Sequence, residues 1–134
     1  RATLDELDAE AYAELARKGE AIRTGVQEAI DAAEVGDWVS IDGAAARTVV
    51  VIAEPQPSDD GLLARSLVQQ EMALRGILFN GNNFICLAHS DEDIAQAVEA
   101  YEAAFARLAE GIATGDIAGL LEGPPVQPAF RPVA

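Results

Sequence analysis

The feature of this sequence that most constrains its fold is a periodic run of apolar residues between Ile94 and Ile112. Six large apolar side chains recur there at steps of 4, 3, 4, 3 and 4: Ile94, Val98, Tyr101, Phe105, Leu108 and Ile112. This spacing puts them on one face of an α-helix, which has to be buried against other elements. Ser90 stands before the run as an N-cap, with Asp93 three positions later, and acidic side chains in a first turn favour the helix dipole. The sequence therefore predicts a long amphipathic helix late in the chain.

Two more helices are expected before this one. The first runs from Leu4 to about Ala33. Its apolar face is formed by Tyr12, Leu15, Ile22, Val26 and Ile30. The second runs roughly from Gly61 to Arg75, and Gly76 follows it as a C-terminal stop. Gly19 and Gly25 lie inside the first helix, where each costs about 1 kcal/mol relative to Ala, so they either let another element approach closely or are simply tolerated.

Strands are expected between the helices. Trp38–Asp42 alternates apolar and polar residues, as a half-buried strand does. Thr48–Ala53 is a continuous, β-branched run, which is typical of a strand covered on both faces or central in its sheet. Ile77–Phe79 is a short strand or extended segment, Asn80–Asn83 is a turn, and Phe84–Ala88 is a third strand.

The order of the elements predicts the fold class. Helix, strand, strand, helix, strand and helix in succession indicate an α+β fold: a two-layer sandwich with a small, mostly antiparallel sheet of three to four strands and helices packed on one face. The chain of 134 residues fits one domain. A loop over residues 55–61 precedes the second helix, and a short helix over Asp116–Leu121 is followed by an extended, Pro-rich tail over residues 123–134.

The charge of the chain narrows the possible partners. Acidic residues outnumber basic ones by 23 to 9, for a formal net charge of −14. Nucleic acids and anionic membranes repel such a chain, and its acidic surface is expected mainly to keep it soluble. No apolar run approaches the roughly 18 residues that span a bilayer. The single cysteine, Cys86, has no partner for an internal disulfide, which favours a cytoplasmic location.

Residues with catalytic chemistry are scarce: one histidine, one cysteine and one lysine. Cys86 and His89 lie three residues apart, and a strand would separate them by about 10 Å, too far for a nucleophilic pair. His89 is instead expected to pack against the start of the last helix. Lys18 stands among charged neighbours in the middle of a helix and is expected to face water rather than a desolvated pocket. One histidine and one cysteine also make a zinc site improbable without many carboxylates. These residues alone predict no catalytic group in this chain.

Two motifs nevertheless resemble a known enzyme family. The segments Arg75–Gly81 and Leu87–Ile94, "RGILFNG" and "LAHSDEDI", are similar to the C-terminal region of class III aminotransferases. Among these, the glutamate-1-semialdehyde 2,1-aminomutase group is most similar. The tail Leu121–Arg131 and the start Ala2–Leu7 fit the same pattern, so the resemblance covers nearly the whole chain.

The resemblance implies a fold-type-I, pyridoxal-phosphate-dependent enzyme that forms a homodimer and acts on a small amino acid or semialdehyde. In this family the large domain holds the cofactor, through a lysine and an aspartate that precede the region matched here. No residue of this chain takes those roles, Lys18 included. Residues 1–134 would be the small C-terminal domain, which closes one side of the substrate pocket and is inactive alone. The alternatives are an independent acidic α+β binding module without a cofactor, or a regulatory ferredoxin-like domain.

The resemblance also implies candidate residues for the substrate pocket. In ornithine- and γ-aminobutyrate-type members, an arginine before the last long helix binds a substrate carboxylate, and Cys86 occupies that position here. A thiol cannot make the bidentate contact of an arginine. Arg47 either supplies a carboxylate contact instead or merely faces water. Asn80, in the turn before the third strand, is expected to lie with Cys86 on the edge that faces the large domain.

Overall fold

The computed structural model of the chain describes residues 7–55 and 62–127. Its elements in chain order are α2 (Ala9–Ala32), β1 (Val39–Ala44), β2 (Arg47–Ile52), α3 (Leu63–Leu74), β3 (Asn82–Phe84), α4 (Asp91–Thr114) and the 3₁₀ turn η1 (Ala118–Leu120). The expected helical residues before position 7, most of the loop over 55–61 and the end of the tail lie outside the described residues.

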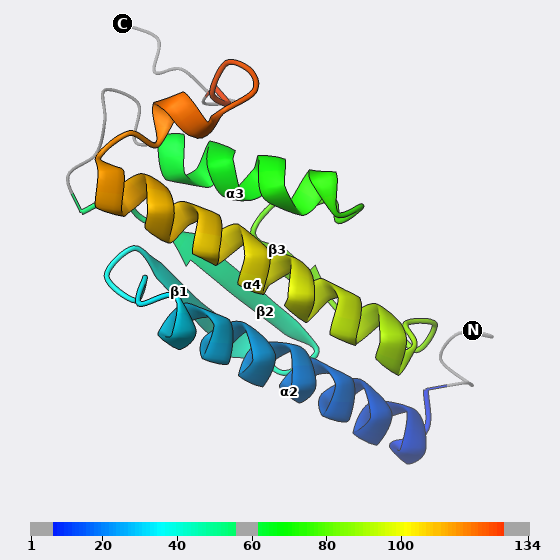
Figure 1. Ribbon diagram of the computed structural model, residues 1–134. Helices are drawn as coiled ribbons and strands as arrows, with labels where there is room; N and C mark the ends of the chain where they lie inside the picture. Colours follow the sequence, from blue (N-terminus) through cyan, green and yellow to red (C-terminus); the bar gives the residue numbers. More distant parts are fainter. Residues whose placement is uncertain (1–6, 56–61, 128–134) are drawn as a thin grey trace, which may run out of the picture.

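The three strands form one antiparallel sheet in the order β1-β2-β3. Figure 1 shows the helices as a layer over one face of this sheet, with α4 between α2 and α3. The predicted α+β fold, with a small antiparallel sheet and helices packed on it, is confirmed.

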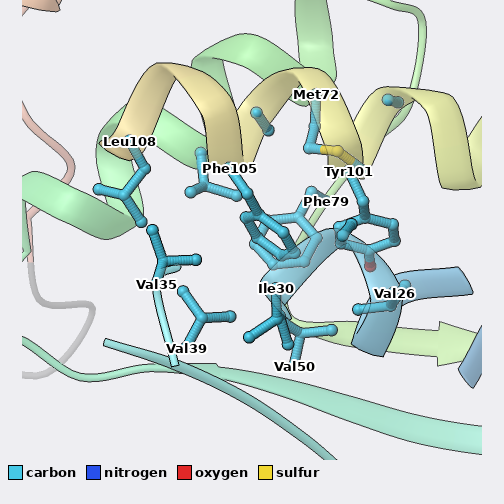
Figure 2. Packing of buried hydrophobic residues seen from close by; sticks show 14 of the residues in the cluster. Val26, Ile30, Val35, Val39, Val50, Met72, Phe79, Tyr101, Phe105 and Leu108 are labelled. Atoms are coloured by element: carbon cyan, nitrogen blue, oxygen red, sulfur yellow. The ribbon is translucent and has the colours of Figure 1, made fainter. Parts of the chain in front are cut away.

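The core forms between the two layers, around the apolar face of α4. Tyr101, Phe105 and Leu108 of this helix are fully buried, and Figure 2 shows them among side chains from α2, α3 and the sheet. The ring of Tyr101 meets Phe79 edge-on at 5.9 Å between centroids and lies 5.6 Å from Phe105. Val98, in the same apolar stripe, is only partly buried but still packs on the core. The periodicity of the sequence therefore identified the main buried surface.

Both ends of α4 are capped, and the N-terminal cap at Ser90 is the one that the sequence predicts. The side chain of Ser90 accepts a hydrogen bond from the backbone of Asp93, whose own carboxylate accepts one from the backbone N–H of Ser90. This is a complete capping box, which satisfies two N–H groups at the helix start. Gly115 ends the helix in a left-handed conformation at φ 69°.

The predicted apolar face of α2 is right only in its second half. Ile22, Val26 and Ile30 are buried, Leu15 is half-buried, and Tyr12 is 58% exposed. The first turns of α2, which include Tyr12, extend past the sheet in Figure 1.

The third strand also differs from the expectation. Of the expected strand Phe84–Ala88 only Phe84 is a strand residue, and Ile77–Phe79 is an extended segment rather than a strand. Pairing with β2 instead starts at the expected turn, where Val50 donates a backbone hydrogen bond to Gly81. The pairing of the two strands ends with the hydrogen bond from the N–H of Ile85 to the carbonyl oxygen of Ala46. Residues after Ile85 have no strand residue opposite them, because β2 begins at Arg47.

A close contact fixes α2 against the β1–β2 hairpin. A Cβ atom added to Gly19 would lie 1.9 Å from the carbonyl oxygen of Ala45, in the hairpin turn. Gly25 makes a similar approach to the side chain of Val98 in α4. Of the two explanations for these glycines, close approach of another element is the correct one.

We expect Gly19→Ala to destabilise the domain by about 1–3 kcal/mol, because the methyl group meets backbone that cannot rotate away. Urea unfolding measures this change. The sign of the change in the free energy of unfolding tests the contact. At a helical position without the contact, the same substitution would stabilise the protein by about 1 kcal/mol, because alanine has the higher helix propensity.

Candidate functional site

The side of the sheet away from the helices carries exposed groups of mixed chemistry. Residues directly opposite each other on paired strands share a face of the sheet. Thr48 and Val50 are buried on the helix side, so their neighbours in the strand point the other way. We call this second side the open face. It comprises Ser40, Asp42, Ala44, Arg47, Val49, Val51, Asn82 and Phe84. Of these, Val51 is 47% exposed and Phe84 is 58% exposed, which is unusual for large apolar residues of a sheet.

Arg47 and Phe84 form the most specific contact on the open face. The two residues are a direct cross-strand pair at one end of the sheet. The guanidinium carbon of Arg47 lies 5.4 Å from the centroid of the Phe84 ring, a cation–π contact that fixes the orientation of the long arginine side chain. This contact gives the exposed side chain of Arg47 a defined orientation.

Cys86 lies just beyond Phe84, and its relation to His89 differs from the expectation. Their side chains are not about 10 Å apart, as a strand would place them. The chain turns here, with a hydrogen bond from the N–H of His89 to the carbonyl of Cys86. The thiol sulfur and Nδ1 of His89 are 3.7 Å apart.

This proximity does not make a catalytic pair. Nδ1 of His89 also accepts the backbone N–H of Cys86 at 3.2 Å, so its single lone pair is engaged in holding the turn. Within the described residues, no carboxylate is hydrogen-bonded to the ring of His89. We therefore interpret His89 as a brace of the turn over residues 86–89, which fits its expected packing before α4.

Lys18 is buried, and the expectation that it faces water is wrong. It is 7% exposed, and its ammonium group donates to the carbonyl oxygen of Leu87 at 3.2 Å and meets Glu14 at 3.2 Å. Hydrogen bonds from Arg17 and then from Lys18 lower the pKa of the Glu14 carboxyl to about 2. The lysine thus connects α2 to the turn that carries Cys86. Its charged sequence neighbours concealed this role, because the turn that covers it comes from a distant segment.

Asn80 lies apart from the other two candidates. It stands before β3, whereas Arg47 and Cys86 lie at the opposite end of that strand. Its carbonyl oxygen accepts a hydrogen bond from Arg65, and its side chain accepts the N–H of Asn82, so it shapes the turn into β3. The structure therefore brings Arg47 and the segment of Cys86 to one end of the sheet but places Asn80 elsewhere.

A buried polar network attaches β3 to α4 and to β2. The hydroxyl of Tyr101 donates to the side-chain oxygen of Asn83 at 2.8 Å, and the amide of Asn83 donates to the hydroxyl of Thr48 at 3.2 Å. Burial raises the pKa of Tyr101 to about 12. Asn83 was expected only as a turn residue, because nothing in its local sequence indicates a partner eighteen residues away in α4.

Tyr101→Phe should destabilise the domain by about 1–2 kcal/mol at neutral pH, since it leaves the Asn83 oxygen without its donor. This difference in the free energy of unfolding between the wild type and Tyr101→Phe should become smaller above pH 10. The phenol ionises near pH 10 in the unfolded chain but only near pH 12 in the folded one, so the wild type loses stability in that window by up to about 1.4 kcal/mol per pH unit.

Denaturant unfolding of the wild type and Tyr101→Phe between pH 8 and pH 11 measures this effect. Tyr12→Phe is the matched control, because it removes an exposed hydroxyl. A difference between wild type and Tyr101→Phe that stays constant across the range would contradict the assignment.

The described residues do not fit a site for covalently bound pyridoxal phosphate. The only lysine of the chain is enclosed by Glu14 and the carbonyl of Leu87, and both contacts hold its amine as a hydrogen-bond donor. A Schiff-base lysine needs an open approach to its nitrogen. No group of three or more His, Cys, Asp or Glu side chains suited to a metal ion occurs in residues 7–55 and 62–127.

We therefore expect Lys18 to stay largely unmodified when the 134-residue chain is mixed with stoichiometric pyridoxal phosphate and reduced with borohydride. Glu14 and the carbonyl oxygen of Leu87 enclose its amine and block the approach of the cofactor. Peptide mass mapping gives the readout. Urea-unfolded chain is the positive control, in which the freed lysine should react. Saturable labelling of Lys18 in the folded chain would disprove the expectation.

The fold is one that occurs within pyridoxal-phosphate-dependent transaminases. One solved structure, a transaminase with pyridoxal phosphate bound, aligns with 81% of this chain at a TM-score of 0.70 and 21% identity. An omega-transaminase from Sphaerobacter thermophilus aligns with 80% of it at a TM-score of 0.66 and 19% identity. The alignments cover 26% of each of those chains, so this sequence spans about a quarter of the length of the transaminases it matches.

The likeness at these identities is one of fold. No family model and no curated protein matches the sequence. Among the described residues, no helix is long and apolar enough to cross a membrane. The expected relation to the transaminase fold is confirmed, while the closer resemblance to the aminomutase group stays a prediction.

Proposed function

We propose that this chain is the small domain of a pyridoxal-phosphate-dependent aminotransferase or aminomutase that acts on a small amino acid or semialdehyde. The observation that carries the proposal is the match of four fifths of the chain to about a quarter of two transaminases. Such a proportion is expected of one domain of a larger enzyme. The motifs "RGILFNG" and "LAHSDEDI" support the same assignment independently and favour the aminomutase group.

The proposal divides the chemistry between two parts of the enzyme. The cofactor, which makes the α-carbon of an amino acid reactive, belongs to a large domain that supplies the lysine, because Lys18 is engaged elsewhere. The small domain, which this chain forms, would supply one wall of the substrate pocket and exclude water from it. The open face and the turn over residues 86–89 are the parts suited to that task, with Arg47 and Cys86 as pocket residues and Asn80 as a more remote candidate.

The exposed apolar groups of the open face support such a covering partner. Val51 and Phe84 lie on a sheet that would otherwise present them to water. We further propose that the complete enzyme is a homodimer, as the resemblance implies, and that it is cytoplasmic, as the single cysteine favours.

The test is to compare the 134-residue chain with the same sequence expressed in one polypeptide with a large cofactor domain. We expect the longer polypeptide to bind pyridoxal phosphate, detected by its visible absorbance, and to transfer amino groups or isomerise glutamate-1-semialdehyde. The 134-residue chain alone should do neither. A folded longer polypeptide that binds no cofactor would overturn the proposal and favour an acidic α+β binding module.

A further inference from the structure

A groove runs between α2 and α4 on the outer surface of the helix layer. The two helices lie side by side and run in the same direction in Figure 1, and the groove between them has a volume of about 850 Å³. Ala21, Thr24 and Glu28 of α2 line it and are exposed, whereas Ile22 and Val26 of the same helix are buried in the core. The groove is therefore separate from the open face of the sheet, and a partner that covers the open face leaves it accessible.

Small and apolar residues form the floor of the groove. They are Ala21 and Gly25 of α2 and Ile94, Ala95 and Val98 of α4. Gly25 allows the two helices to approach closely here, because a Cβ atom at this position would lie 2.6 Å from a methyl carbon of Val98. Small side chains on both helices let a third element pack near both helix axes. The floor is thus apolar surface that is shaped for a partner to cover.

The rim of the groove is acidic. Four carboxylates and one guanidinium line it, which gives a formal charge of −3: Glu20, Glu28, Asp91, Glu99 and Arg17. Arg17 is paired with Asp91, and Glu20 also has an ion-pair partner. Glu28 and Glu99 have no hydrogen-bond or ion-pair partner among residues 7–55 and 62–127. The groove therefore presents two uncompensated carboxylates, one from each helix.

We propose that this groove binds a cationic amphipathic helix of another protein, with apolar side chains on the floor and Lys or Arg side chains beside Glu28 and Glu99. The α2 wall runs from Arg17 to Glu28, roughly 16 Å at 1.5 Å per residue, which matches about three turns of such a helix. Long basic side chains lay their methylene groups along apolar surface while their charged ends reach the carboxylates. The inference goes beyond the proposed function and does not depend on it.

The charge of the chain decides against other occupants of the groove. A second copy carries the same net charge of −14, and contact between two grooves would bring carboxylates together without compensation. Nucleic acids and anionic membranes are repelled for the same reason. An amphipathic helix without basic residues would cover the floor but desolvate Glu28 and Glu99 without pairing them.

The experiment measures the binding of a labelled peptide to the 134-residue chain by fluorescence anisotropy. The probe is a helical peptide of about 12 residues with leucines along one face and lysines at the flanking positions. One companion peptide has serine in place of the leucines, and another has glutamate in place of the lysines. We expect the leucine–lysine peptide to bind with a Kd of about 1–100 µM, as suits a small interface, and both companions to bind at least about 10-fold more weakly.

A first pair of variants tests whether the peptide occupies the groove. Ala21→Tyr fills the floor and should weaken binding at least about 10-fold. Ala16→Tyr is the matched control, because Ala16 is an exposed residue of α2 that does not line the groove, and the Kd should stay within about twofold. Circular dichroism establishes that both variants are folded.

A second pair of variants tests the rim. Glu28→Gln combined with Glu99→Gln should weaken binding by about 3- to 30-fold, since two exposed ion pairs with the peptide are lost. Glu10→Gln combined with Glu122→Gln removes the same charge from exposed positions outside the groove and should change the Kd by less than about twofold.

Three results would overturn the inference. The first is equal binding of the leucine–lysine peptide and either companion peptide. The second is a groove variant that binds as tightly as its matched control. The third is self-association of the wild-type chain that Ala21→Tyr abolishes, which would assign the groove to a second copy. None of these results concerns cofactor binding or amino-group transfer, so the proposed function stands or falls separately.

Discussion

The attachment of β3 to the rest of the domain depends on one buried tyrosine hydroxyl. Tyr101 lies in the apolar face of α4, where its ring packs between Phe79 and Phe105 and contributes to the core. A hydroxyl in such surroundings is costly unless it is hydrogen-bonded, and Asn83 of β3 supplies the acceptor. Because β3 has only three residues, its own ladder is a weak attachment to the sheet. The bonds from Tyr101 to Asn83 and on to Thr48 connect it to both layers.

The two sides of the sheet therefore differ in what their side chains do. The helix side contains the core and most of the stabilising contacts. The open face is free of those packing demands, so it presents Arg47 and Phe84, which add little to the core. The core therefore does not determine which side chains the open face carries.

The sequence predicts those parts of the fold that depend on local periodicity or on caps. The stripe of α4 and its Ser90–Asp93 capping box are readable, since both depend on residues a few positions apart. The limits of the third strand cannot be predicted in this way, because they depend on where its partner β2 begins. The burial of Lys18 could not be predicted for a similar reason, because the carbonyl oxygen that accepts its hydrogen bond belongs to Leu87, far away in the sequence. Arg47 was identified as a candidate from its residue type, but its contact with Phe84 requires the register between β2 and β3.

The contact between Lys18 and Leu87 has a consequence for how such a domain can vary. The lysine holds a main-chain oxygen, which every amino acid provides, so the anchor does not depend on which side chains the turn carries. Residues 86–88 can therefore be exchanged for others while the loop keeps its path. Cys86 and Leu87 are exposed, and the path of the backbone in this segment does not depend on their side chains. Proteins built on this scaffold can therefore change the exposed side chains of this loop while its backbone stays in place.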